Sequence, residues 1–279
     1  MNTTISGFSK LSKSEKIDWI IATHFNNDSS AKTTLTQYWN SDEKLQKLHD
    51  EFIENTVSNY YLPFAVAPNF KINGKSYTIP MAIEESSVVA AAAKSANFWY
   101  SKGGFKTEVL STTKIGHVHF LWEGSDAKSL ENFVELIKPK FFEETDGITK
   151  NMRQRGGGIS EIRLVDKRED IPHYFQLEAE FETCDSMGAN FINTCLEKFS
   201  EVLRTEIGNS GLEQNELEVI MCILCNYTPK CLVRSEVICP IDKMVEGTDI
   251  SPADFAKRFQ TAVRIAETQV YRAVTHNKG

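Results

Sequence analysis

The sequence predicts an α+β protein in which a ferredoxin-like module, with the element order β-α-β-β-α-β, is inserted into a larger mixed domain made from both ends of the chain. Two observations predict the module. Residues 174–182 alternate between apolar and polar side chains, which is the period of a half-buried strand. Residues 219–225 form a continuous apolar run, typical of a buried strand. We therefore expect three segments, 1–106, 107–217 and 218–279, with the middle one as the insert.

Length and composition limit the class of protein. The 279 residues are enough for one large or two ordinary domains, and 41% hydrophobic with 25% charged residues is ordinary for a globular chain. A net charge of −7 argues against nucleic acid or an anionic membrane as the main partner. No apolar run is long enough for a transmembrane helix, and the first residues lack the features of a secretory signal. Six cysteines do not make a dense disulfide framework, so we expect a cytoplasmic protein with reduced thiols.

The N-terminal segment combines helices with a hairpin. Residues 12–53 have the pattern of polar-faced helices, with Ser12 and Ser14 as candidate N-caps and Glu15 in the first turn. Residues 69–80 predict a β-hairpin, because Asn73-Gly74 supplies the turn between two apolar-containing strands.

An alanine-rich helix is expected after the hairpin. Either Ser86 or Ser87 is placed to cap it, and the run Ala90–Ala93 allows another backbone or a ligand to approach closely. The pair Gly103-Gly104 then indicates a hinge into the next module.

The middle segment supplies the elements of the insert. Residues 117–122 and 159–165 predict strands, and 130–142 has helical spacing although Pro139 falls within it. Residues 187–207 predict a long helix with one apolar face, ended by a glycine-containing turn.

The C-terminal segment begins with a strand-like piece at 232–241. Ser251 as N-cap and Pro252 at the first helical position then predict a helix start. We expect this helix to bury an apolar stripe, made of Phe255, Phe259, Ala262, Val263 and Ala266.

The hexapeptide Asp185–Asn190 lies between a predicted strand and a predicted helix. Free N–H groups at a helix start attract anions, and Gly188 would let a phosphate come close. The ordinary alternative is that Asp185 caps the helix and Gly188 makes a tight packing contact. The residues alone do not decide between these interpretations, although no G-x-G-x-x-G fingerprint is present.

Two further clusters have residues suited to chemistry. In the pair Glu84-Glu85, a carboxyl placed in an apolar environment can donate a proton near neutral pH, although a charged helix start is the commoner role. Near the end of the chain, Lys278 is a cation that can stabilise an oxyanion, and Arg272 can hold a carboxylate. A solvated tail is the usual state of a lysine in that position.

Four separated motifs, in order, resemble those of hydroxymethylglutaryl-CoA reductases of the soluble, bacterial class II. Asp185–Asn190 resembles the dinucleotide motif Asp-Ala-Met-Gly-Ala-Asn, with Ser186 as the only difference. The stretch Glu84–Ser87 resembles Glu-Glu-Pro-Ser, and Glu54–Ser58 resembles Glu-Asn-Val-Ile-Gly. Residues 271–279 resemble the lysine-bearing motif of the family, and the resemblance runs from about Glu51 to the end of the chain.

The resemblance implies a substrate-binding domain, here 1–106 and 218–279, interrupted by an NAD(P)-binding ferredoxin-like domain at 107–217. It implies reduction of 3-hydroxy-3-methylglutaryl-CoA to mevalonate and CoA with two NAD(P)H, or the reverse, in a homodimer. In this interpretation Glu85 donates the proton and Lys278 stabilises the oxyanion. The implied substrate contacts are Ser87, Arg272 and Asn55, and the implied cofactor contacts are Asp185, Met187, Gly188, Asn190 and Asn226.

The choice between NADPH and NADH depends on one position before the glycine-rich turn. Family members that favour NAD have an acidic residue there, which bonds the ribose hydroxyl. Our alignment puts Thr149 at that position, with Lys150 and Arg153 nearby. The absence of an acidic residue at this position and the basic residues nearby favour NADPH.

We expect no metal. Cys222, Cys225 and Cys231 lack a fourth spaced ligand, and buried thiols are the more common state in an apolar strand. The alternating His117 and His119 are a weak signal for a metal by themselves.

The family's catalytic aspartate and a thiolate-protonating histidine are expected beyond Gly279. The sequence therefore leaves two alternatives to a working reductase, a non-catalytic CoA- or nucleotide-binding fragment and one half of a split enzyme.

Overall fold

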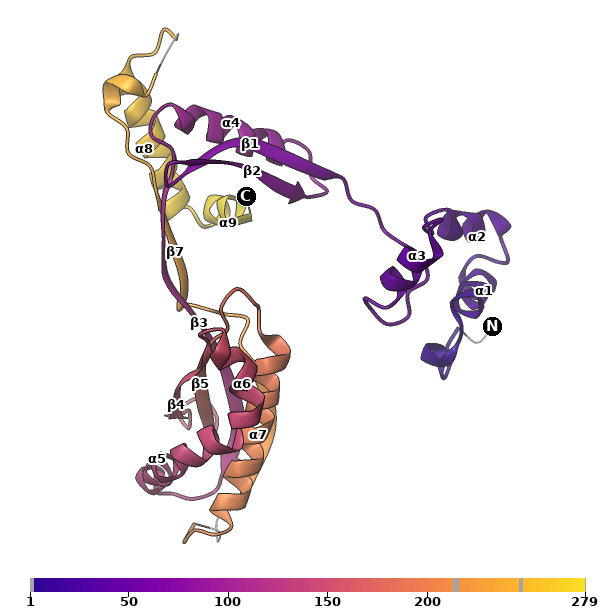
Figure 1. Ribbon diagram of the computed structural model, residues 1–279, viewed down its shortest axis with the longest axis vertical. Coiled ribbons are helices and arrows are strands. Elements are labelled where there is room, and N and C mark those ends of the chain that lie inside the picture. The colour runs from indigo at the N-terminus through magenta and orange to yellow at the C-terminus, as the bar shows by residue number, and fades with distance from the viewer. Residues whose placement is uncertain (1–2, 213–215, 246–247, 279) are drawn as a thin grey trace. The chain divides into compact units, whose positions relative to one another are not determined.

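The computed structural model describes residues 3–212, 216–245 and 248–278 (Figure 1). Contacts within the chain divide it into two compact units. The terminal unit consists of Met1–Gly104 and Ile238–Gly279, and the inserted unit is Phe105–Val237. The inserted unit ends well past the expected boundary at 217, because two further strands pair with its longest strand.

Capped helices begin the terminal unit. In the capping box of the first, Glu15 N–H donates to Ser12 Oγ at 3.3 Å and Ser12 N–H donates to Glu15 Oε2 at 2.7 Å, as predicted. Asp28 and Asp42 cap the next two through their carboxylates. The helices are α1 (Lys13–His24), α2 (Ser29–Thr36) and α3 (Glu43–Asp50), preceded by a short 3-10 turn, η1 (Phe8–Lys10).

The predicted hairpin and alanine-rich helix follow. Asn73 and Gly74 have φ values of +48° and +83°, which the two-residue turn requires. The expected serine cap of the helix is wrong, because Ser87 occupies the N-cap position with φ +72° and makes no capping hydrogen bond. The elements are β1 (Phe64–Ile72), β2 (Lys75–Ala82) and α4 (Val88–Tyr100), which packs on β1.

The inserted unit has the ferredoxin-like topology. Its antiparallel sheet has the strand order β4-β5-β3-β6, and β7 pairs with the first half of β3. The predicted strand at 117–122 is thus the second half of a longer one. The elements are β3 (Lys106–Trp122), α5 (Ala127–Glu144), α6 (Asp146–Gln154), β4 (Gly158–Asp166), β5 (Tyr174–Glu182), α7 (Ala189–Ile207), β6 (Leu217–Leu224) and β7 (Cys231–Glu236).

One face of this sheet and the helices enclose the core. Phe120 and Phe175 are fully buried between the sheet and the helices. Gly116 allows α7 to lie close to β3, because a Cβ there would be 2.7 Å from Leu196 Cδ1. The helix α5 continues through Pro139, and Phe141 beyond it packs on Phe199 of α7 with ring centroids 5.2 Å apart.

The C-terminal helices belong to the terminal unit. Ser251 caps the first as predicted, since Asp254 N–H donates to its Oγ at 3.1 Å. The expected buried stripe is wrong: Phe259 and Val263 are 47% and 46% exposed, and no residue of that helix is buried in the described part of the chain. The elements are η2 (Ile241–Lys243), α8 (Pro252–Thr268) and α9 (Val270–Lys278).

None of the helices within the described residues has the length and apolar character needed to cross a bilayer.

Candidate functional site

The loop between β5 and α7 carries the predicted dinucleotide motif. Gly188 has φ +76°, and a Cβ at this position would be 2.5 Å from Thr183 Cγ2. Both facts require glycine. The carboxylate of Glu182 accepts the N–H of Cys184 at 2.7 Å and also bonds the hydroxyl of Thr112, so the start of the loop is tied to β3.

The helix start at this loop has no side-chain cap. Gly188 is the N-cap residue of α7, so the alternative in which Asp185 caps the helix is wrong. Asp185, Met187 and Asn190 are exposed, with Met187 at 63%. The first turn of α7 therefore presents backbone N–H groups without an acceptor from the N-cap side chain, which is an arrangement that suits a phosphate.

The end of β6 is joined to the same helix start. Leu224 N–H donates to Asn193 Oδ1 at 2.9 Å, and Cys225 N–H donates to the Ile115 carbonyl at 2.8 Å. Asn226 follows directly and is exposed. The structure thus brings Asn226 to the edge of the sheet where α7 begins. Asn193 was not predicted from the sequence, where its only signal is a polar residue between the apolar positions Ile192 and Cys195.

The turn after α6 lies against this loop. A Cβ on Gly157 would be 2.4 Å from the Glu182 carbonyl, and Cys184 Sγ donates to the Arg155 carbonyl at 3.2 Å. Thr149, at the position where NAD-favouring members have an acidic residue, is 3% exposed, and its hydroxyl donates to the Thr145 carbonyl within the helix. It is therefore not available to a ribose.

Three charged side chains of α6 face solvent. Arg153 bonds the carboxylate of Asp146 at 2.5 Å, and both side chains are about half exposed or more. Lys150 is also exposed. This surface contributes two cations and one anion next to the loop that follows β5.

Glu85 and Ser87 line one groove of the terminal unit. The groove has a volume of about 610 Å³ and is bordered by Val66, Ala90 and Ala93 among others. Both candidate residues are exposed. Small side chains on α4 keep this groove open, as the alanine run predicted.

Arg272 lines a different groove, between α8 and α9. This groove has a volume of about 440 Å³, and its other walls include Phe259, Val263 and His276. Glu85 and Arg272 therefore do not share a pocket in the described structure. The backbone of Lys278 ends α9, but its side chain lies outside the described residues.

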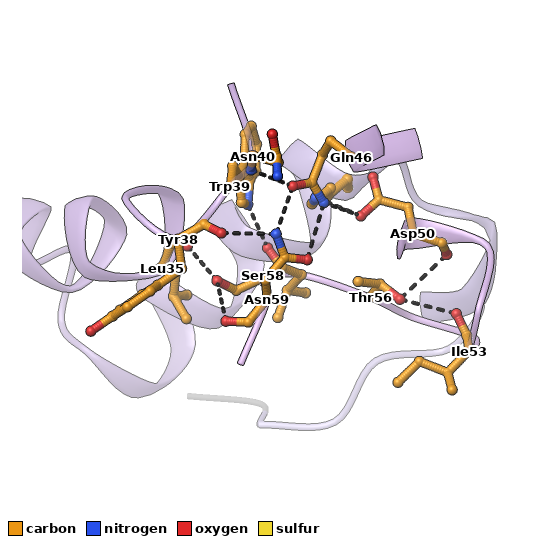
Figure 2. Close-up of polar contacts among 12 residues, drawn as sticks. Leu35, Tyr38, Trp39, Asn40, Gln46, Asp50, Ile53, Thr56, Ser58 and Asn59 are labelled. Atoms are coloured by element: carbon orange, nitrogen blue, oxygen red, sulfur yellow. Dashed lines mark hydrogen bonds and ion pairs between the residues drawn. The ribbon is translucent and has the colours of Figure 1, made fainter. Parts of the chain in front are cut away.

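Hydrogen bonds hold the residues before and after Asn55. Thr56 Oγ1 donates to the Ile53 carbonyl at 3.0 Å (Figure 2). Asn59 Nδ2 donates to the Tyr38 carbonyl at 2.8 Å and to Gln46 Oε1 at 2.7 Å. Trp39 Nε1 donates to the Val57 carbonyl at 2.9 Å. Asn55 itself is exposed, with φ +59°, and lines neither groove.

The open face of the inserted sheet carries paired histidines. His119 Nδ1 lies 2.6 Å from Tyr174 Oη, and His117 Nε2 lies 3.3 Å from a carboxylate oxygen of Glu178. Burial lowers the pKa of His119, and the charge of His117 lowers it further. In the described parts of the chain no group of three or more His, Cys, Asp or Glu side chains is arranged to hold a metal ion.

Cys222 and Cys225, in and directly after the apolar strand β6, are half-buried rather than fully buried. Burial raises the pKa of the Cys222 thiol, and burial raises the pKa of Cys195 on α7 to about 12. Such thiols are weakly reactive.

Comparison with known proteins gives one family. A model of the family described as hydroxymethylglutaryl-coenzyme A reductase matches residues 15–279. The chain is 30% identical over 285 aligned residues to the 3-hydroxy-3-methylglutaryl-coenzyme A reductase of Archaeoglobus fulgidus, covering all of this chain and 59% of that protein. It is 32% identical over 241 residues to the probable reductase of Borreliella burgdorferi, covering 83% of this chain and 51% of that protein.

Solved structures agree with these relatives. The class II reductase of Streptococcus pneumoniae, determined with NADPH in open conformations, superposes with a TM-score of 0.71 at 28% identity. The match covers 98% of this chain and 71% of that one. The chain spans between half and three-fifths of the length of the two curated relatives above.

Proposed function

Because the chain belongs to the hydroxymethylglutaryl-coenzyme A reductase family, we propose that it carries the substrate-binding and NAD(P)H-binding parts of an enzyme that reduces 3-hydroxy-3-methylglutaryl-CoA to mevalonate and CoA, or runs the reverse reaction. The observation that carries the proposal is the loop at Gly188. A family motif falls where a helix begins without a side-chain cap, at a position that only glycine occupies without strain.

The cofactor proposal uses the residues at this loop. Asp185, Met187, Gly188 and Asn190 contact the dinucleotide, with the phosphates at the N-terminus of α7. Asn226 contacts the nicotinamide end, which its place beyond β6 supports. When bound, NAD(P)H supplies hydride, while the residues of this chain bind and orient it.

We assign NADPH as the preferred cofactor. The position of Thr149 carries no acidic residue, and Lys150 and Arg153 are exposed on the same helix. A guanidinium and an ammonium favour the extra phosphate of NADPH. Asp146 opposes them in part by pairing with Arg153.

The substrate proposal uses the terminal unit. Glu85 donates the proton, Ser87 and Asn55 contact the substrate, and Arg272 holds the carboxylate of the glutaryl group. Lys278 stabilises the oxyanion. The shared groove of Glu85 and Ser87 supports their pairing in one site.

We further propose a homodimer located in the cytoplasm. Large apolar side chains are exposed beside the Asn55 segment, with Tyr60 at 85% and Phe64 at 77%, and surfaces of this kind are commonly covered by a partner. All six cysteines are free thiols, as is usual in a reducing compartment. Sedimentation velocity tests the dimer, and a monomer at micromolar concentration would contradict it.

Two measurements test the function. In the first, NADPH and NADH are titrated into the purified chain and followed through nicotinamide fluorescence, with tighter binding expected for NADPH. In the second, the protein at its natural length is incubated with hydroxymethylglutaryl-CoA and NADPH, and mevalonate is measured by mass spectrometry. Wild type is expected to form mevalonate and Glu85→Gln is expected not to. Failure of both nucleotides to bind, or equal turnover by Glu85→Gln, would overturn the proposal.

A further inference from the structure

Two hydroxyl groups close the turn that precedes the dinucleotide loop. Ser186 Oγ donates to the Thr183 carbonyl at 2.8 Å, and Thr183 Oγ1 donates to the Ser186 carbonyl at 2.7 Å. Ser186 N–H also donates to the Thr183 carbonyl, at 3.1 Å. The two residues therefore make a reciprocal pair, in which each side chain satisfies the backbone of the other.

This pair holds a backbone that would otherwise be unfavourable. Cys184, inside the turn, has φ +53°, which a residue with a side chain seldom adopts. The carboxylate of Glu182 binds the Cys184 N–H from one side, and the reciprocal pair closes the turn from the other. The conformation is thus maintained by side chains on both sides of the strained residue.

The pair also determines where the helix start lies. Thr183 is fully buried, and Gly188 packs directly against its methyl group. A shift of Thr183 would therefore move Gly188 and the first N–H groups of α7. Met187, between the pair and Gly188, would move with them.

Ser186 is the one position at which this chain departs from the family motif noted above, which has alanine there. Alanine has no hydroxyl and cannot donate to the Thr183 carbonyl. The reciprocal pair is therefore a property of this chain that the motif does not imply.

We propose that Thr183 and Ser186 are positioning residues of the dinucleotide loop, which hold Met187 and Gly188 in the phosphate-binding conformation before the ligand arrives. The inference rests on the proposed function, since it assumes that the loop binds NAD(P)H. Ordering a loop in advance lowers the cost of binding, so loss of either hydroxyl weakens the complex.

The test compares dinucleotide binding with loop mobility. Ser186→Ala and the nearly isosteric Thr183→Val are each expected to weaken NADPH binding about fivefold, the effect of losing one ordinary hydrogen bond. Thr183→Ser keeps the hydroxyl but loses the methyl group that Gly188 contacts, and it is expected to bind NADPH more tightly than Thr183→Val. Hydrogen exchange of the backbone amides at 184–190 in the ligand-free protein is expected to be faster in Ser186→Ala and Thr183→Val.

Ser200→Ala is the matched control. Ser200 is a nearly buried serine of α7 whose hydroxyl donates to the Glu197 carbonyl at 2.8 Å, so its loss removes a similar bond outside the loop. The control is expected to bind NADPH as wild type does. A merely structural role for Ser186 would lower the melting temperature without changing the affinity.

The outcomes separate this inference from the proposed function. Wild-type affinity in Ser186→Ala, or weaker binding without faster exchange at 184–190, overturns the positioning role and leaves the proposed function standing. A wild-type protein that binds neither NADPH nor NADH overturns both.

Discussion

The side-chain amide oxygen of Asn193 accepts the backbone N–H of Leu224 at 2.9 Å, and this bond ties the N-terminal part of α7 to the end of β6. The N-terminal part of α7 and the far end of the next strand thereby meet where Asn226 follows that strand. The bond connects the two parts of the proposed cofactor site.

Replacement of Asn193 tests this connection. Asn193→Ala leaves the partly buried N–H of Leu224 without its acceptor, so we expect a loss of about 1 to 2 kcal/mol in the free energy of unfolding. NADPH binding is expected to weaken as well, because the end of β6, which Asn226 follows, is no longer held to α7. Urea denaturation and fluorescence titration measure the two effects. Asn132→Ala, the same change at an exposed position of α5, is expected to change neither by much.

Glycine at position 188 is required by both backbone and space. Gly188→Ala places a Cβ 2.5 Å from Thr183 Cγ2 at a φ of +76°, so the loop must shift. We expect NADPH binding to fall at least tenfold, the equivalent of about 1.4 kcal/mol. Gly147→Ala is the control, because its Cβ meets open space in a helix and should be neutral or slightly stabilising. Equal affinity in the two variants would contradict the assignment of the loop.

Asp146 is expected to limit the preference for NADPH. Its carboxylate pairs with Arg153 at 2.5 Å, so Asp146→Asn frees the guanidinium for the additional phosphate. The ratio of NADH to NADPH dissociation constants should rise by about twofold to fivefold. Asp170→Asn breaks a similar surface pair with Lys167, before the opposite end of β5, and is expected to leave the ratio unchanged. A ratio that stays constant in Asp146→Asn would remove Arg153 from cofactor selection.

His119 should make stability depend on pH. Burial, followed by the neighbouring charge of His117, lowers the pKa of His119 below its ordinary value of about 6.5, so the folded protein binds this proton less readily than the unfolded chain. The contribution of His119 to the free energy of unfolding is fully present above about pH 6.5. It falls as the pH drops from there to the pKa of His119 in the folded protein, and it stays constant below that pKa. His117, Tyr174 and Glu178 are the titratable groups around it.

The variant His119→Gln should flatten this dependence. Urea midpoints measured between about pH 7.5 and about pH 5 are expected to fall less steeply in His119→Gln than in wild type. His24→Gln, an exposed position on α1, should follow the wild-type curve. Parallel curves for wild type and His119→Gln would refute the role of His119.

Gln46 is expected to be the most sensitive polar residue of the N-terminal helices (Figure 2). It is 9% exposed and bonds Asp50, Asn59 and the N–H of Asn40. Gln46→Ala should lower the free energy of unfolding by about 2 to 3 kcal/mol and increase hydrogen exchange across residues 54–59. Gln37→Ala, exposed after α2, serves as the control and should behave as wild type. Unchanged exchange at 54–59 would show that the network does not hold the Asn55 segment.

Much of the inserted unit followed from local patterns. The alternation at 174–182 and the apolar run at 219–225 predicted two strands, and their order with the helices predicted the ferredoxin-like topology. The strand β6 is not buried as its apolar run suggested, since Ile220 and Ile223 are 49% and 48% exposed. Ser12, Ser251 and the turn Asn73-Gly74 were also predicted correctly. These features depend on residues close in the sequence, whose capping and turn preferences act without the rest of the fold.

Features that depend on distant partners were not predicted. Thr149 is buried because α6 packs its face inward. The stripe of α8 is covered only in part, since Phe255 packs on Phe98 of α4 with ring centroids 6.3 Å apart while Phe259 and Val263 stay exposed. The pairing of β7 with the first half of β3 extends the inserted unit beyond the expected boundary.

The sequence by itself therefore determined the elements, their order and the motif that indicates the family, since each is encoded by a short stretch of residues. Only the tertiary structure decided that Asn193 holds Leu224, that Gly188 packs on Thr183, and that Glu85 and Arg272 line separate grooves. The reason is physical. Backbone preferences act over a few residues, whereas hydrogen bonds and contacts between elements depend on which surfaces the fold brings together.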